Sequence, residues 1–116
     1  MTLTQLLEWQ WQGYPRYHGS RSNLLIHIVA VPLFLVCNVA LVVMLSQGRF
    51  GLALLALAGM VLSLALQGRG HKLESVPPEP FTGPGQAVAR LFFEQWLTFP
   101  RFVLSGGWWH ALQASR

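Results

Sequence analysis

Three histidines and one glutamate are the residues of this chain with the clearest chemical potential. His18 and His27 flank the start of one apolar stretch, and His71 and Glu74 follow the end of another. Three imidazoles and a carboxylate suit a borderline divalent metal such as iron(II) or zinc(II). Because the chain has no aspartate and a single cysteine, aspartyl dyads, Ser-His-Asp triads and multi-cysteine zinc sites are excluded.

The spacing of these residues restricts how they can meet. His18 and His27 are nine positions apart, which on one straight helix would place their side chains about 180° apart. They can face one site only if the chain breaks between them, and the sequence His18-Gly19-Ser20 offers that break, with Ser20 or Ser22 as helix cap. His71 and Glu74 are three positions apart and can share one helix face.

Two apolar stretches must position the four side chains. Residues 24–45 would extend about 33 Å as a helix and residues 50–67 about 27 Å, against a bilayer hydrocarbon core of about 30 Å. Residues 46–49 are the only link between them, which predicts an antiparallel transmembrane hairpin. With 53% hydrophobic and 10% charged residues among 116, we expect an all-α membrane protein that forms a single domain, 1–116.

The basic residues indicate an orientation rather than a nucleic-acid surface. They are scattered singly, so the net charge of +4 does not form a basic patch, and no nucleic-acid partner is expected. One basic residue lies in the link, and four flank the outer ends of the hairpin: Arg16, Arg21, Arg69 and Lys72. The positive-inside rule therefore predicts that both termini are cytoplasmic.

Three further segments complete the chain. Residues 2–12 predict an interfacial helix that begins with a capping box at Thr2 and Gln5. Residues 75–85 contain four prolines and two glycines and predict a loop. Residues 86–109 are apolar but interrupted, which favours an interfacial or re-entrant helix pair broken near Pro100. Glu79 and Glu94 have no sequence neighbours that single them out, and Glu94 could be an intramembrane polar contact.

Two blocks of the sequence resemble a known family, the small membrane proteins typified by the fungal 2-hydroxy-fatty-acid dioxygenase of phytosphingosine breakdown. The first block is Tyr14-x3-His18-x4-Asn23-x3-His27, followed by Pro32. The second is Gln67-x2-Gly70-His71-x2-Glu74, followed by Pro77. The C-terminal segment is similar to that of a bacterial branch, which implies the bacterial inner membrane.

The resemblance implies an iron(II)-dependent dioxygenase that converts a 2-hydroxy fatty acid into the acid one carbon shorter. It implies that His18, His27 and His71 hold the iron, and we expect Glu74 to join them as a ligand and catalytic residue. Arg21, Asn23 and Arg69 are the predicted substrate-binding residues, and Tyr14 and Gln67 are predicted to lie behind the ligands. Dioxygen would be the co-substrate, and the partners would be the lipid substrate and the bilayer.

Two other functions fit the same residues. A non-catalytic membrane scaffold or accessory subunit would bind a larger protein and no metal. A zinc-dependent lipid hydrolase would use Glu74 as general base and would need no dioxygen. The sequence predicts no particular oligomeric state.

Overall fold

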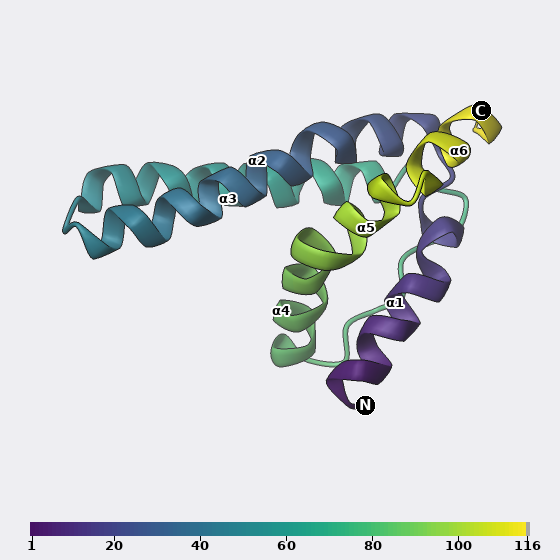
Figure 1. Ribbon diagram of the computed structural model, residues 1–116, viewed down its shortest axis with the longest axis horizontal. Coiled ribbons are helices and arrows are strands. Elements are labelled where there is room, and N and C mark those ends of the chain that lie inside the picture. The colour runs from purple at the N-terminus through teal and green to yellow at the C-terminus, as the bar shows by residue number, and fades with distance from the viewer. Residues whose placement is uncertain (116) are drawn as a thin grey trace.

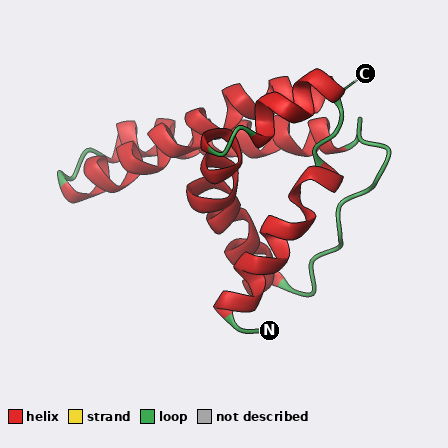
Figure 2. Ribbon diagram, turned by 45° about the vertical axis from the view of Figure 1, so that its right-hand side comes forward, coloured by secondary structure: helices red, strands yellow, loops and turns green. Residues whose placement is uncertain are grey.

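The computed structural model describes residues 1–115, which form helices, turns and loops without any strand. The all-helical class predicted from the sequence is thus confirmed (Figures 1 and 2). The elements in chain order are α1 (Leu3–Tyr17), α2 (Arg21–Ser46), α3 (Phe50–His71), α4 (Pro84–Phe93), the π-helical turn η1 (Glu94–Thr98), α5 (Phe99–Leu104) and α6 (Gly107–Ala114).

The two longest helices, α2 and α3, lie side by side and run in opposite directions (Figure 1). The turn that joins them contains Gly48 with a φ of 68°, a left-handed conformation that glycine adopts without steric cost. Helix α2 has 26 residues and α3 has 22, and both are long and apolar enough to cross a membrane by length and composition.

Small residues allow α2 and α3 to approach closely. A Cβ atom at Gly70 would collide with Oδ1 of Asn23, and one at Gly59 would collide with Sγ of Cys37. Between these two points the buried Ser63 hydroxyl donates a hydrogen bond to the carbonyl of Ala30. Helix pairs in membranes use the same combination of small residues and hydroxyl hydrogen bonds.

Helix α1 begins and ends where the residue chemistry favours a boundary. The capping box is present, with Gln5 N–H donating to Oγ1 of Thr2 and Thr2 N–H donating to Oε1 of Gln5. The helix extends beyond the predicted residue 12 to Tyr17, and the chain then breaks at His18 and Gly19. Ser20, one of the two caps that the sequence offers, caps α2, and the break separates His18 from the helix that carries His27.

The C-terminal segment is helical past Pro100, so the predicted break near that proline is wrong. Helix α4, η1 and α5 follow one another without a gap, and the chain breaks instead at Ser105 and Gly106. Within η1 the Phe99 N–H donates to the carbonyl of Glu94, five residues earlier. This wider turn comes just before Pro100, where an ordinary helix would lose a hydrogen bond because proline has no N–H.

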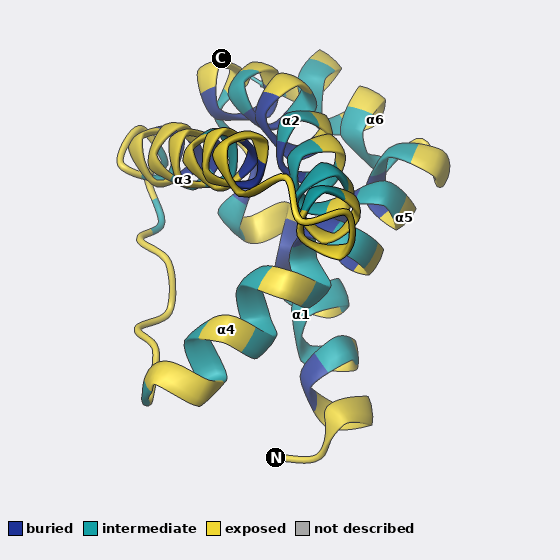
Figure 3. Ribbon diagram, turned by 90° about the vertical axis from the view of Figure 1, so that its left-hand side faces the viewer, coloured by how far each residue is buried: buried dark blue, intermediate teal, exposed yellow. Residues whose placement is uncertain are grey.

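Burial is concentrated at one end of the α2–α3 pair. A core cluster there joins α1, α2 and α5 and consists of Tyr14, Leu24, Val31, Phe99 and Phe102. Towards the turn between α2 and α3, large apolar side chains are exposed on both helices (Figure 3). A contiguous exposed apolar surface of this kind marks contact with a membrane or a partner.

Candidate metal centre

Three histidines from three helix ends meet inside the buried end of the molecule. His18 follows the last turn of α1, His27 lies in the second turn of α2, and His71 is the last residue of α3. Their ring centroids are 4.9 Å (His18–His27), 4.7 Å (His18–His71) and 5.0 Å (His27–His71) apart. The rings are nearly perpendicular to one another, with interplanar angles of 88°, 79° and 85°.

Backbone contacts fix which ring nitrogens point into the cluster. Nδ1 of His18 lies 2.8 Å from the carbonyl of Tyr14, and Nδ1 of His27 lies 3.0 Å from the carbonyl of Asn23. Since a carbonyl only accepts, both Nδ1 atoms carry the proton, and both Nε2 atoms keep a free lone pair. Neither Nε2 has a hydrogen-bond partner among the described residues, although both are buried. Metal-binding histidines have this arrangement, with one nitrogen held and the other free.

Glu94, the first residue of η1, is the fourth member of the cluster. One ligand atom from each of His18, His27, His71 and Glu94 lies within 4.8 Å of the others. This spread is close to the roughly 4 Å that separates donors on opposite sides of one ion. No other described histidine, cysteine or acidic residues form such a group. The four side chains therefore fit a single divalent metal ion.

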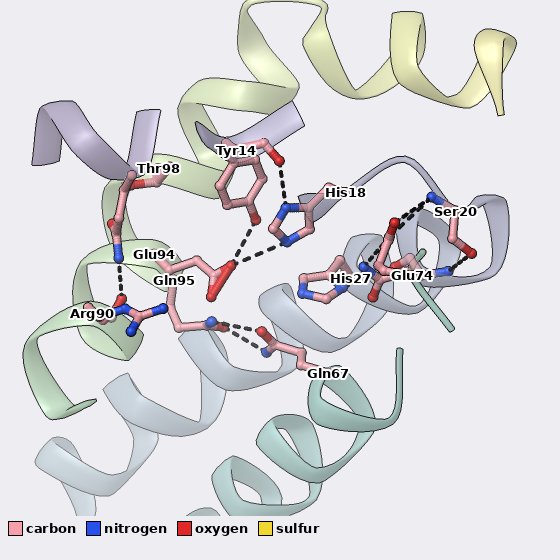
Figure 4. A network of polar contacts seen from close by, with 12 residues as sticks. Tyr14, His18, Ser20, His27, Gln67, Glu74, Arg90, Glu94, Gln95 and Thr98 are labelled. Atoms are coloured by element: carbon pink, nitrogen blue, oxygen red, sulfur yellow. Dashed lines mark hydrogen bonds and ion pairs between the residues drawn. The ribbon is translucent and has the colours of Figure 1, made fainter. Parts of the chain in front are cut away.

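Neighbouring side chains stabilise the negative charge of the Glu94 carboxylate (Figure 4). Its Oε2 accepts a hydrogen bond of 3.1 Å from the hydroxyl of Tyr14 and lies 3.5 Å from Nε2 of His18. Burial raises the pKa of the Glu94 carboxyl, but the close approach of His18 and the nearby His27 and His71 outweigh burial and lower the pKa to about 2. Burial, followed by the charge of Glu94, raises the pKa of the Tyr14 hydroxyl, which therefore stays a proton donor.

The sequence pattern around Glu94 does not predict its place in the cluster. Glu94 lies 23 positions beyond His71 and has no local motif. The one signal in the sequence is the energetic cost of placing a carboxylate in a largely apolar segment, because such a group needs a specific partner. Tyr14, which the sequence predicts to lie behind the ligands, has its ring stacked on that of His18 at 3.8 Å between centroids.

Glu74 is predicted from the sequence to be a ligand, but in the structure its carboxylate lies outside the cluster and binds the chain break between α1 and α2. Its carboxylate accepts hydrogen bonds from the backbone N–H groups of Gly19 and Ser20, both at 3.0 Å to Oε1. Its Oε2 accepts a bond of 2.6 Å from the side-chain amide of Asn23. The carboxylate thus anchors the break between α1 and α2 to the end of α3. Helix α3 ends at His71, so Glu74 lies beyond the helix and does not share a helical face with His71.

Removing the Glu74 carboxylate should weaken the fold. We expect Glu74→Ala to lower the free energy of unfolding by about 2–3 kcal/mol, because the buried Asn23 amide and two backbone N–H groups lose a charged acceptor. Thermal unfolding in detergent, followed by circular dichroism, measures this loss. Glu8→Ala, at an exposed position of α1, should leave the melting curve unchanged. Unchanged stability of Glu74→Ala together with loss of bound metal would show that Glu74 is a ligand.

Gln67, also predicted to lie behind the ligands, pairs with the residue that follows Glu94. The buried side-chain amides of Gln67 and Gln95 exchange two hydrogen bonds, each of 2.8 Å. Gln67 also donates to the hydroxyl of Ser63 at 3.0 Å. This reciprocal pair joins η1 to α3 (Figure 4) and so helps to position the backbone of Glu94, the residue before Gln95.

The amide pair can be tested with a double-mutant cycle. Gln95→Leu leaves the Oε1 atom of Gln67 buried without its donor, which should cost about 1–3 kcal/mol of unfolding free energy. Combining it with Gln67→Leu should restore part of that loss, because both polar groups are then absent. Unfolding of the two single variants and the double variant in the same detergent measures the coupling. Strictly additive losses would contradict the pairing.

A cavity of about 630 Å³ opens beside the cluster, and its walls include His18, His71 and Glu94. Two cationic residues line it, Lys72 and Arg90. The predicted substrate-binding residues Arg21, Asn23 and Arg69 do not. Arg21 is exposed and donates to Ser115 at 3.2 Å, Asn23 is buried against Glu74, and Arg69 is exposed on α3. Their predicted contact with substrate is therefore not supported by their positions.

These features together define an all-helical protein with two membrane-length apolar helices and a buried group of three histidines and one carboxylate. Residues 4–103 match the family model described as "2-hydroxy-palmitic acid dioxygenase Mpo1-like". The match covers most of the chain, and the protein belongs to this Mpo1-like family. No curated protein and no solved structure matches the chain.

Proposed function

We propose that this protein is a membrane-embedded, iron(II)-dependent dioxygenase that removes one carbon from 2-hydroxy fatty acids. The observation that carries the proposal is the convergence of three imidazoles, two of them buried, and one carboxylate beside a cavity. The family description, which names a 2-hydroxy-palmitic acid dioxygenase, supports the same chemistry.

The residues that would hold the iron are His18, His27, His71 and Glu94. Imidazole nitrogens with a carboxylate are the ligands typical of non-haem iron(II) oxygenases, and zinc(II) is the alternative that such a set also binds. Bound iron(II) would supply the activation of dioxygen and a place for the substrate's 2-hydroxyl and carboxylate groups to bind side by side.

The overall reaction needs no further reductant. A 2-hydroxy acid, R–CH(OH)–COOH, and O₂ give R–COOH, CO₂ and H₂O, an equation in which every atom balances. The bond between the carboxyl carbon and the carbon bearing the hydroxyl breaks, and the substrate supplies all four electrons that reduce dioxygen. The electron balance therefore requires no flavin or reductase partner.

The protein's own groups would hold the centre and the substrate. The Tyr14 and Asn23 carbonyls keep the Nδ1 protons of His18 and His27 in place, so that the Nε2 lone pairs point inwards. The Tyr14 hydroxyl orients the Glu94 carboxylate. Lys72, next to His71 on the cavity wall, would pair with the substrate carboxylate in place of the predicted arginines.

The membrane placement follows from the apolar helices. Helices α2 and α3 would form a transmembrane hairpin, with the turn at residues 47–49 on the far side of the bilayer. Helices α1 and α4 to α6 would then lie at the cytoplasmic interface with the metal centre, in the inner membrane of a bacterium. Basic residues at that end of the hairpin agree with the positive-inside rule.

Anaerobic purification with metal analysis, followed by an oxygen-consumption assay, tests the function. We expect bound iron and, on adding a 2-hydroxy fatty acid and air, equal amounts of CO₂ released and O₂ consumed. Bound zinc with lipid hydrolysis in the absence of dioxygen would indicate a hydrolase. A protein that binds no metal and co-purifies with a larger membrane protein would indicate a scaffold.

A further inference from the structure

The cavity beside the metal centre has a second distinctive wall. Besides the candidate ligands, the cavity is bounded by α1 from Trp9 to Tyr17, by the C-terminal part of α3, by the segment 72–83 between α3 and α4, and by the end of α4. Figure 2 shows this segment, which has no helix of its own, passing from the end of α3 to the start of α4. The volume of about 630 Å³ is within the roughly 300–1,000 Å³ of small-molecule sites.

Trp9, Phe81 and Arg90 form a stack on this second wall. The Arg90 guanidinium carbon lies 5.0 Å from the centroid of the Trp9 ring and 4.5 Å from that of the Phe81 ring. The same guanidinium donates a hydrogen bond of 3.2 Å to the carbonyl of Pro80. One cation of α4 therefore contacts both α1 and the segment 72–83, through one aromatic ring of each.

The stack lies apart from the metal centre along the cavity. Trp9 lies eight positions before Tyr17, the last residue of α1, and His18 comes directly after it, so Trp9 and the start of the cluster are about 12 Å apart along the helix. Between the two, the cavity wall is mainly apolar or aromatic and includes Tyr17, Leu64 and Leu91. A ligand that reaches from one wall to the other must therefore have a polar end and an apolar remainder.

We propose that this cavity binds a single fatty acyl chain and that the Trp9–Arg90–Phe81 stack limits the length of chain it accepts. This inference rests on the proposed function, because the reacting end of the chain is placed at the histidine–glutamate cluster. The methyl end of the chain meets the aromatic rings of the stack. A chain too long for the distance between the two walls can bind only if the stack opens.

Removing one ring of the stack tests the inference through binding alone. The protein is freed of metal with a chelator, placed in phosphatidylcholine nanodiscs and loaded with a fluorescent fatty acid, which straight-chain 2-hydroxy acids of increasing length then displace. Unaltered protein should show affinity that rises with length and then stops rising. In Trp9→Ala and in Phe81→Ala this limit should move to longer chains, which gain roughly tenfold in affinity for every two further methylenes buried.

Matched substitutions outside the cavity provide the controls. Phe92→Ala removes an exposed phenylalanine of α4, and Trp109→Ala removes an exposed tryptophan of α6, neither of which lines the cavity. Both should keep the length limit of the unaltered protein. The inference is overturned if Trp9→Ala and Phe81→Ala keep that limit too. It is also overturned if added phospholipid, but no 2-hydroxy acid, displaces the fluorescent fatty acid, since the occupant would then be a bilayer lipid.

The same measurement separates this inference from the proposed function. Binding is measured without metal, so a shift in the length limit stands even if the iron-loaded protein releases no CO₂. Conversely, CO₂ release together with an unchanged length limit in both stack variants would retain the dioxygenase and reject the role of the stack.

Discussion

Replacing His71 with alanine is expected to abolish both metal binding and turnover. His71 is the one cluster histidine that is only partly buried, so its removal disturbs packing less than removal of His27, which has no exposed surface. Loss of one of four candidate ligands should lower metal affinity by more than the roughly 10–100-fold typical of losing a residue that supports a ligand. Iron content after anaerobic purification and CO₂ release from a 2-hydroxy fatty acid measure the two effects.

His110→Ala is the matched control for this experiment. His110 lies exposed on α6 and is not part of the cluster, so this variant should keep both the iron and the activity. Circular dichroism establishes that each variant retains its helices. A folded His71→Ala variant that keeps the iron content and turnover of the unaltered protein would remove the histidine cluster from the mechanism.

Replacing Glu94 with glutamine should have an effect of similar size for a different reason. Glutamine keeps the shape of the side chain and can still accept the hydrogen bond from Tyr14, but it removes the negative charge. Because the pKa of Glu94 is lowered to about 2, the carboxylate is ionised at neutral pH and contributes that charge to the centre. We expect metal affinity to fall by at least about 100-fold, with CO₂ release falling in parallel, while the helices stay intact.

The comparison between Glu94→Gln and Glu74→Gln decides which carboxylate is the ligand. Titration of metal-free protein with iron(II) under anaerobic conditions measures the affinity of each variant. Glu74→Gln should bind iron with nearly the affinity of the unaltered protein, since Glu74 anchors the chain break between α1 and α2. Glu8→Gln, at an exposed position, should behave like the unaltered protein. Loss of iron binding in Glu74→Gln alone would reverse the assignment.

Local sequence patterns were sufficient for most of the structural features that depend on neighbouring residues. The apolar stretches predict the two long helices, and the short link predicts that they fold back on each other. The capping box at Thr2 and the cap at Ser20 follow from side chains that satisfy nearby backbone N–H groups. The predicted helix break near Pro100 is wrong. A widened π-helical turn precedes the proline, so the helix continues although proline has no N–H to donate.

Local sequence patterns did not predict the fourth member of the cluster, Glu94. Glu74 is close to His71 in sequence, and helical spacing would have placed the two on one face. Helix α3 ends at His71, however, and the free N–H groups at the chain break attract the Glu74 carboxylate instead. Glu94 lies beside the histidines because of tertiary contacts, which include the Gln67–Gln95 pair between α3 and η1 and the hydrogen bond from Tyr14 of α1.

The sequence by itself determined the helical class, the two membrane-length helices and the three histidines that lie at their ends. These depend on hydrophobic patterns and on a short link that leaves the chain one way to turn. Only the tertiary structure decided which carboxylate joins the histidines and which cationic residues line the cavity beside them. Those contacts join residues far apart in the chain, and their partners are selected by how α1, α3 and α4 pack together rather than by spacing along any one helix.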